Sequence, residues 1–180
     1  PREEFYLLLL CSVTGALGLV ASTHLATLFI SLELLSMPLY GMLAYSFRAG
    51  QSLEAGIKYL ILSAAASALL LFGMALIYAR TGSMDLATLA PGLAGPDIWI
   101  LAGAVLMIAG LGFKLSVVPF HLWTPDVYQG GPAPASTFLA TVSKLAVFVV
   151  FLRLVAVAPV FDGEWLRSLL VVLALITMLG

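Results

Sequence analysis

The sequence predicts an all-α polytopic membrane protein, and three observations support this prediction. First, 62% of the 180 residues are hydrophobic and only 9% are charged, and the mean hydropathy is +1.13. Soluble domains carry about 25% charged residues, so this chain has too little polar surface for water to be its main solvent. Second, its apolar runs are about 17–26 residues long, the length at which a helix crosses a bilayer. Third, these runs lack the period-two alternation of a membrane barrel, which favours helices.

Six transmembrane helices are expected, in a single transmembrane domain covering residues 1–180. The Ser22-Thr23-His24 turn separates the first from the second, and Arg48 marks the start of the loop before the third. The longest polar interval follows, with Pro91 and Pro96, and the fourth span then runs into a proline-rich stretch that makes one helix discontinuous. The expected spans are about 5–22, 24–46, 53–79, 97–119, 134–157 and 164–180. Because the chain begins at Pro1 and ends inside an apolar run, we expect a segment of a longer protein.

Several classes of function are disfavoured by composition. The net charge is −1 and no basic block is present, so a nucleic-acid partner has no support. The single cysteine, Cys11, lies in an apolar run and is interpreted as a small buried side chain. Aromatic residues gather near the expected span ends, as in an interfacial belt. They are Tyr45, Phe47, Tyr59, Trp123 and Tyr128 on one side and Tyr78, Trp99 and Trp165 on the other.

Four charged residues inside the expected spans stand out, Glu33, Lys58, Lys114 and Lys144, while Arg153 lies near the end of its span. An ionised group at the bilayer centre costs about 2.5–3.5 kcal/mol, so each requires an explanation. Lys58 is only about a turn and a half inside its helix, and an interfacial anchor is the alternative reading for it. For the other three the alternative is a structural ion-pair staple. Three lysines cannot all pair with one glutamate, so at least one buried amine is expected to exist partly neutral and to act as a proton relay.

Two prolines accompany two of these charges at the same spacing. Pro38 lies five residues after Glu33, and Pro119 lies five residues after Lys114. A proline cannot donate to the carbonyl four residues before it, so each frees a carbonyl beside a charge. Freed backbone at membrane depth requires protein or a water-filled cavity, and discontinuous helices with charges at the break are typical of transporters. We therefore expect the helix to break between Lys114 and His121. Because a midplane carboxylate needs a partner to remain ionised, we also expect Glu33 to pair with Lys58 on the adjacent helix.

The stretch "FKLSVVPFHLWTPDVYQGGPAPASTFLATVSKLAVF" resembles the signature of the antiporter-like membrane subunits of respiratory complex I, a family shared with Mrp-type sodium/proton antiporters. The form "PFHLWTPDVYQG" with "LATVSKLA" is most similar to the N-type subunit of bacterial NADH:quinone oxidoreductases, whereas other branches usually read "P-H-x-W-L-P-x-A". The upstream stretches "FISLELLSMPLYGMLAY" and "EAGIKYLILSAAASALLLFGMALIY" resemble the fifth and sixth helices of the same subunit. The resemblance covers nearly the whole chain.

The resemblance implies roles for five residues of a proton relay. Glu33 matches the family's fifth-helix glutamate, Lys58 the sixth-helix lysine, and Lys114 the lysine at the break of the seventh helix. Lys144 matches the eighth-helix lysine, and His121 the histidine just beyond the break. The family builds two inverted five-helix repeats, and this chain would hold the first repeat and the start of the second. His24 is interpreted as an interface residue and Arg153 as a snorkelling residue. Asp126 is interpreted as a turn or N-terminal helix residue.

The implied function is that of a membrane subunit of a proton-pumping NADH:quinone oxidoreductase in the bacterial inner membrane, an enzyme subunit without a redox centre of its own. No cofactor is expected on this chain, and NADH, FMN, iron–sulfur clusters and quinone would belong to other subunits. The expected partners are the antiporter-like and small membrane subunits of complex I and the lipid bilayer. Two alternatives remain: a subunit of an Mrp-type cation/proton antiporter, and a purely structural membrane subunit.

Overall fold

The computed structural model describes residues 2–46, 50–87, 97–157 and 164–179. These residues are almost entirely helical and contain no named strand, which confirms the all-α prediction. The helices are α1 (Arg2–Ala21), α2 (Leu25–Leu43), α3 (Gly50–Thr81), α5 (Ile98–Leu115), α6 (Thr124–Gly130), α7 (Ala133–Phe138), α8 (Lys144–Val157) and α9 (Glu164–Leu179). Predictions that involve Phe47, Arg48, Pro91 and Pro96 lie outside the described residues.

Within the described ranges, five helical stretches are long and apolar enough to cross a membrane. They are Glu3–Ala21, Leu25–Leu43, Gly50–Thr81, Ile98–Leu115 and Ala133–Ala156. The sixth expected span is helical as α9, but its 16 described residues are shorter than a membrane crossing requires. The chain is therefore a polytopic all-α membrane protein, as predicted.

The fourth expected span is shorter than predicted, because α5 ends at Leu115 and not near residue 119. Ser116 adopts a left-handed conformation with φ of 58°. Its N–H donates to the Phe113 carbonyl at 3.0 Å, and the N–H of Val117 donates to the Gly112 carbonyl at 2.9 Å. This is the pattern of a Schellman cap, which satisfies the last carbonyls of a helix. The helix thus stops one residue after Lys114, before the chain reaches its proline.

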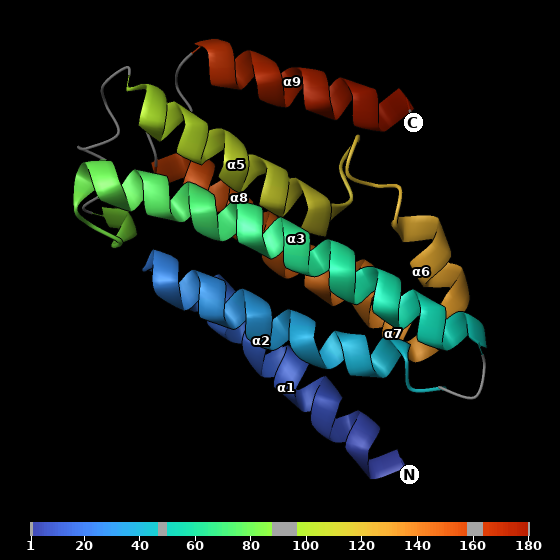
Figure 1. Cartoon of the computed structure of the whole chain (residues 1–180). Helices are drawn as coiled ribbons and strands as arrows, with labels where there is room; N and C mark the ends of the chain where they lie inside the picture. The colour runs from blue at the N-terminus through green and yellow to red at the C-terminus, as the bar shows by residue number, and fades with distance from the viewer. Residues whose placement is uncertain (1, 47–49, 88–96, 158–163, 180) are drawn as a thin grey trace.

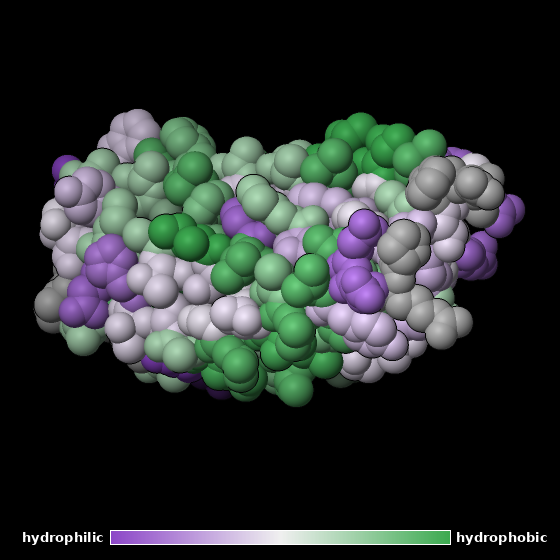
Figure 2. Space-filling view, turned by 90° about the horizontal axis from the view of Figure 1, so that it is seen from below, coloured by the Kyte–Doolittle hydropathy of each residue, from purple (hydrophilic) through white to green (hydrophobic). Residues whose placement is uncertain are grey.

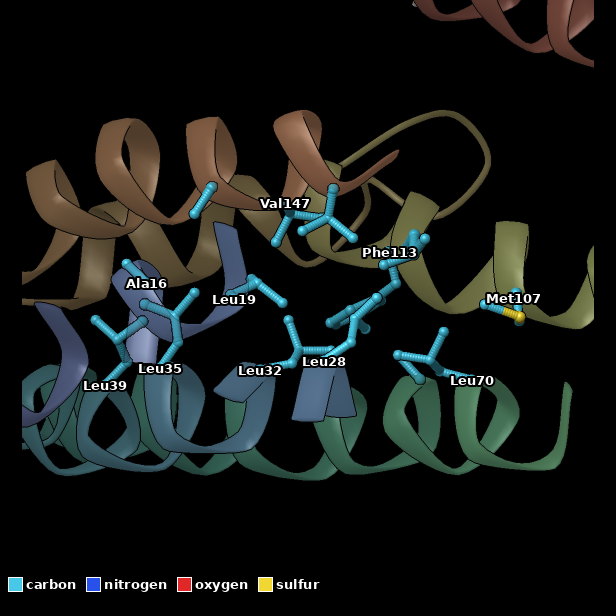
Figure 3. Packing of buried hydrophobic residues seen from close by; sticks show 14 of the residues in the cluster. Ala16, Leu19, Leu28, Leu32, Leu35, Leu39, Leu70, Met107, Phe113 and Val147 are labelled. Atoms are coloured by element: carbon cyan, nitrogen blue, oxygen red, sulfur yellow. The ribbon is translucent and has the colours of Figure 1, made fainter. Parts of the chain in front are cut away.

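The long helices pack side by side in one bundle (Figure 1). α1 packs on α2, α2 on α3, and α3 on α5, while α8 contacts both α1 and α5. Leucines of α2, among them Leu28, Leu32 and Leu35, lie between the helices and meet Leu19 of α1 (Figure 3). α9 lies on the outer side of α5, where Leu166 packs against this helix.

α3 and α5 approach each other closely because small residues line their contact. A Cβ on Gly73 would lie 2.6 Å from the Gly103 carbonyl oxygen. A Cβ on Gly110 would lie 2.8 Å from the Ala66 carbonyl oxygen. Neither position has room for a side chain, so the two backbones touch. Lys114 follows Gly110 by one helical turn, and this contact therefore sets the end of α5 against the middle of α3.

Polar contacts tie the helix ends together. His24 caps α2, because its Nδ1 accepts a hydrogen bond from the Ala26 N–H at 3.2 Å. Asp97 caps α5 by accepting from the Trp99 N–H at 2.8 Å, and it also forms an ion pair with Arg80. The Trp99 N–H and the Arg80 guanidinium hold the pKa of the Asp97 carboxyl below its usual range. Arg153 donates to the Val20 carbonyl near the end of α1, where a cation favours the helix dipole.

The surface agrees with a membrane environment. The face seen from below is mostly apolar or weakly polar, and strongly hydrophilic residues lie mainly toward its two ends (Figure 2). Two residues assigned to the aromatic belt are instead buried: Tyr59 is 1% exposed and Trp123 is 4% exposed. Both lie inside the bundle because they form the wall of the site described next, so this part of the belt prediction is wrong.

Candidate functional site

Lys114 is the most deeply buried ionisable group of the four singled out in the sequence. Its relative exposure is 3%. The ammonium Nζ donates to Ser36 Oγ of α2 at 2.7 Å and to Ser63 Oγ of α3 at 2.5 Å. Three helices thus meet at this side chain, and its nearest polar partners are neutral hydroxyls.

Glu33 lies one helical turn from Ser36, near the middle of α2. Its Oε1 accepts a hydrogen bond from Ser67 Oγ of α3 at 2.5 Å. Glu33 lies on the same face of α2 as Ser36, which binds Lys114. Of Lys58 and Lys114, it is therefore Lys114 whose contacts lie beside the carboxylate.

Tyr40 extends the same cluster along α2. Its hydroxyl lies 2.9 Å from Ser63 Oγ. The spacing of Glu33, Ser36 and Tyr40 by three and four residues puts all three on one face of α2, and Ser63 and Ser67 likewise share a face of α3. The sequence therefore builds a polar seam into the contact between two otherwise apolar helices.

Aromatic rings form a wall beside the seam. The Tyr59 ring lies 5.9 Å from Lys114 Nζ and 5.1 Å from the Trp123 ring. Trp123 stacks on Phe113 at 5.2 Å, and its Nε1 donates to the Phe113 carbonyl at 3.2 Å. The indole thus gives a second hydrogen bond to the Phe113 carbonyl, which also accepts from Ser116, and packs against the Tyr59 ring beside the lysine.

The predicted pair of Glu33 with Lys58 is wrong. Lys58 Nζ instead contacts Glu54 Oε1 at 2.7 Å and Asp126 Oδ2 at 2.8 Å, and its side chain is 42% exposed. Glu33 reaches α3 at Ser67, which lies about 13 Å farther along this helix and on the opposite side from Lys58. The two residues are therefore separated in depth and in direction. This geometry favours the interfacial-anchor reading of Lys58.

Lys144 lies on the other side of the break that follows α5. It is half-buried, and its Nζ is 5.6 Å from the centre of the Tyr128 ring. The residue directly follows a π-helical turn, Leu139–Ser143, which joins α7 to α8. Such single π turns occur frequently at functional sites. The sequence analysis did not predict this turn.

His121 lies in the connection between α5 and α6, as expected, and its surroundings are polar but poorly satisfied. Across the four described ranges, several buried polar atoms of this connection, of α6 and of α7 have no hydrogen-bond partner. They are His121 Nδ1 and the hydroxyls of Ser116, Thr124, Tyr128 and Ser136. Buried polar atoms normally find partners in protein or in ordered water, so their concentration at the break marks a place suited to hydration.

The sequence analysis missed the hydroxyls that surround Lys114. It placed Asp126 correctly at the start of a helix but missed its contact with Lys58. The signal was available in "SLELLSMPLY" and "SAAAS", where polar residues recur at helical spacing in apolar spans. Serine is common in membrane helices as a packing residue, and this ordinary role hid its contact with the lysine.

Comparisons with known proteins agree with this architecture. Residues 22–180 match the family model described as NADH:quinone oxidoreductase/Mrp antiporter, transmembrane. The chain is 66% identical to NADH-quinone oxidoreductase subunit N of Chromohalobacter salexigens, over 99% of this chain and 38% of that protein. The chain thus spans well under half the length of this relative.

Two solved structures are also similar. A chain of respiratory complex I from Thermus thermophilus with bound aureothin shares 45% identity, with a TM-score of 0.76 over 83% of this chain and 34% of that one. A chain of the Mrp complex from Dietzia sp. DQ12-45-1b shares 29% identity, with a TM-score of 0.71 over 87% of this chain and 29% of that one. The predicted resemblance is confirmed, and the chain belongs to the NADH:quinone oxidoreductase/Mrp antiporter family of membrane proteins.

Proposed function

We propose that the full-length protein is a membrane subunit of a proton-pumping NADH:quinone oxidoreductase and that Lys114 carries protons within it. The observation that carries the proposal is the environment of Lys114. Its amine is buried among hydroxyls that can bind both of its protonation states. A serine hydroxyl accepts a hydrogen bond from an ammonium and can donate one to a neutral amine. A structural ion pair would instead hold the lysine permanently charged against a carboxylate.

Glu33 supplies the charge that makes the two states of Lys114 unequal. Its carboxylate acts on the ammonium without a direct ion pair and is itself held by Ser67. A change in the hydrogen bonding of Glu33 alters the electrostatic preference of Lys114 for its proton, since buried charges interact strongly. In this proposal Glu33 biases the relay, and Lys58 serves as an anchor that joins α3 to α6.

The proton passes from Lys114 toward Lys144 through the break after α5. The unsatisfied polar atoms of His121, Tyr128 and Ser136 support this route, because they are suited to hold water between the two lysines. His121 has an imidazole ring that can accept a proton at one nitrogen and donate one from the other. The π turn before Lys144 supplies locally irregular hydrogen bonding at the far end of the route.

The proposed partners are other membrane subunits of complex I, in a bacterial inner membrane. Electron transfer belongs to other subunits, so NADH, FMN, iron–sulfur clusters and quinone are assigned to them and not to this chain. The energy of quinone reduction would then reach Lys114 through contacts with neighbouring membrane subunits.

A second candidate function is that of a cation/proton antiporter subunit of the Mrp type. The family model includes Mrp antiporters, and the Dietzia Mrp chain has a similar fold. The higher identity to subunit N, 66% against 29%, favours the oxidoreductase.

Purification of the full-length protein from its own membranes distinguishes the two. The proposal expects co-purifying quinone reductase subunits and proton uptake by inverted vesicles on addition of NADH. Sodium-dependent proton exchange without NADH-driven uptake would contradict it and support the antiporter.

A further inference from the structure

We propose that Tyr40 and Ser63 form a two-hydroxyl proton wire that leads from Lys114 into the α2–α3 contact. This inference rests on the proposed function, because it assigns the group through which Lys114 exchanges its proton. It names two residues that the sequence resemblance did not include.

The geometry is a continuous chain of hydrogen bonds. Lys114 Nζ lies 2.5 Å from Ser63 Oγ, and Ser63 Oγ lies 2.9 Å from the Tyr40 hydroxyl. Either oxygen of the second bond can be the donor, so the chain has no fixed direction. Both hydroxyls have one proton to give and lone pairs to accept another.

Ser36 touches the same amine but cannot extend the chain. Its Oγ accepts from Lys114 and donates its own proton to the Leu32 carbonyl at 2.8 Å. A backbone carbonyl has no proton to pass on. Both serines therefore anchor the Lys114 amine. Only Ser63 also continues the hydrogen-bond chain, to Tyr40.

The exposed fraction of the side chains is greatest at the Tyr40 end of the wire. Ser63 is 0% exposed and Lys114 is 3% exposed, whereas Tyr40 is only partly buried. The Tyr40 carbonyl lies beside Gly56, whereas its hydroxyl reaches Ser63, about 10 Å farther along α3. The tyrosine side chain thus spans this depth of the α2–α3 contact.

The transfer balances in protons and involves no change of oxidation state. A water-borne proton binds the Tyr40 oxygen while the original Tyr40 proton moves to Ser63. The original Ser63 proton moves to the neutral Lys114 amine, which becomes an ammonium. Each oxygen ends with one proton, and both hydroxyls then rotate back before the next transfer.

The test uses the full-length subunit within its complex in inverted membrane vesicles, with proton uptake measured per quinone reduced. Thr and Val have nearly the same shape, so Ser63→Thr and Ser63→Val differ mainly in the hydroxyl. We expect Ser63→Thr to retain uptake and Ser63→Val to lose about tenfold or more, the scale of losing one positioned proton-transfer group. Tyr40→Phe, at a partly exposed site, is expected to lose uptake similarly.

Two further variants separate the wire from simple anchoring and from lost packing. Ser36→Ala removes an anchor of Lys114 but leaves the wire intact. We therefore expect it to lower proton uptake less than Ser63→Val does. Ser52 is buried on the same helix and bonds only the Leu43 carbonyl, so Ser52→Ala controls for the loss of a buried hydroxyl.

Equal uptake in Ser63→Val and Ser63→Thr, or full uptake in Tyr40→Phe, would overturn the wire. Equal losses in Ser36→Ala and Ser63→Val would assign both serines to anchoring and overturn it as well. An unsubstituted complex that moves no protons would instead refute the proposed function on which the wire rests.

Discussion

At the residue scale, the burial of Lys114 is the feature that most needs a physical explanation. An ionised lysine at membrane depth costs about 2.5–3.5 kcal/mol on insertion scales. Two hydroxyl acceptors, the ring of Tyr59 and the charge of Glu33 offset part of this cost. None of these partners fixes the proton as a direct carboxylate contact would. The arrangement thus tolerates the ammonium without making it permanent.

Lys58 provides a contrast, and its substitution tests whether every lysine of the chain belongs to the relay. Its contacts with Glu54 and Asp126 are solvent-exposed, and such pairs contribute little. We expect Lys58→Gln to keep at least about half of the proton uptake of the full-length protein in its complex, measured in inverted vesicles.

Asp126→Asn is the matched variant on the other side of this pair and is expected to behave in the same way. A complete loss of proton uptake in an assembled Lys58→Gln complex would contradict the anchor role and show that Lys58 is part of the relay.

Prediction from sequence placed Glu33 and Lys114 inside long apolar helices, as the structure has them, but was wrong about the partner of Glu33. The depth of Glu33 and Lys114 in apolar spans could be read directly, because a membrane penalises each charge separately. The partner of Glu33 depends on which faces of α2 and α3 meet, and this is decided by packing across the bundle. Lys58 and Ser67 lie on opposite sides of α3. Because the wrong face of α3 was predicted to meet α2, Glu33 was assigned to Lys58 and not to Ser67.

At the element scale, the contact of α3 with α5 positions the site. Gly110 lies against the Ala66 carbonyl, between Ser63 and Ser67 in height, and one turn before Lys114. Because a Cβ there would lie 2.8 Å from backbone oxygen, α5 must move to accept a side chain. The close approach is therefore a requirement of the hydrogen bond between Lys114 and Ser63.

Gly110→Ala is expected to destabilise the protein by about 1–3 kcal/mol, the usual cost of overpacking, and to weaken the Lys114 contacts. Thermal unfolding of the full-length protein in detergent measures the first effect, and proton uptake measures the second. Gly50→Ala is the control, since a Cβ at Gly50 meets nothing within 4 Å. Equal stability of Gly110→Ala and Gly50→Ala would contradict the close contact.

The positions of the long helices could be predicted, but two local interruptions could not. The length of an apolar run identifies a span, but the end of α5 depends on the cap that follows Leu115. In this cap Ser116 is left-handed, a conformation that serine rarely adopts. The π turn at Leu139–Ser143 leaves no mark in composition, because it consists of one extra residue in an otherwise apolar helix. Both interruptions adjoin a lysine of the proposed relay.

At the scale of the whole molecule, the bundle separates dry contacts from a region suited to water. Leucines fill the space between α1 and α2 (Figure 3). Most of the unsatisfied buried polar atoms of the described residues lie instead around the break after α5. The relay therefore requires hydration at one end of the bundle and exclusion of water beside Lys114. The wall of Tyr59 and Trp123 separates the two.

Hydroxyl-radical footprinting of the membrane-embedded complex tests this separation. We expect oxidation of His121 and Tyr128, because water would meet their unsatisfied polar atoms. Tyr59 and Trp123 are expected to stay protected, since both are packed in the aromatic wall. Equal oxidation of Tyr128 and Tyr59 would show that the break is no wetter than the wall.

The central claim is that protons move through Lys114, and the number of protons translocated per electron tests it most directly. The measurement compares the intact complex with one that carries Lys114→Ala, after assembly of both has been verified. The proposed relay predicts that Lys114→Ala lowers the proton-to-electron ratio or abolishes the coupled quinone reduction. It predicts impairment by Lys114→Arg as well, because arginine holds its proton too tightly to pass it on. An unchanged ratio and rate in an assembled Lys114→Ala complex would contradict the claim and make the buried lysine a structural element.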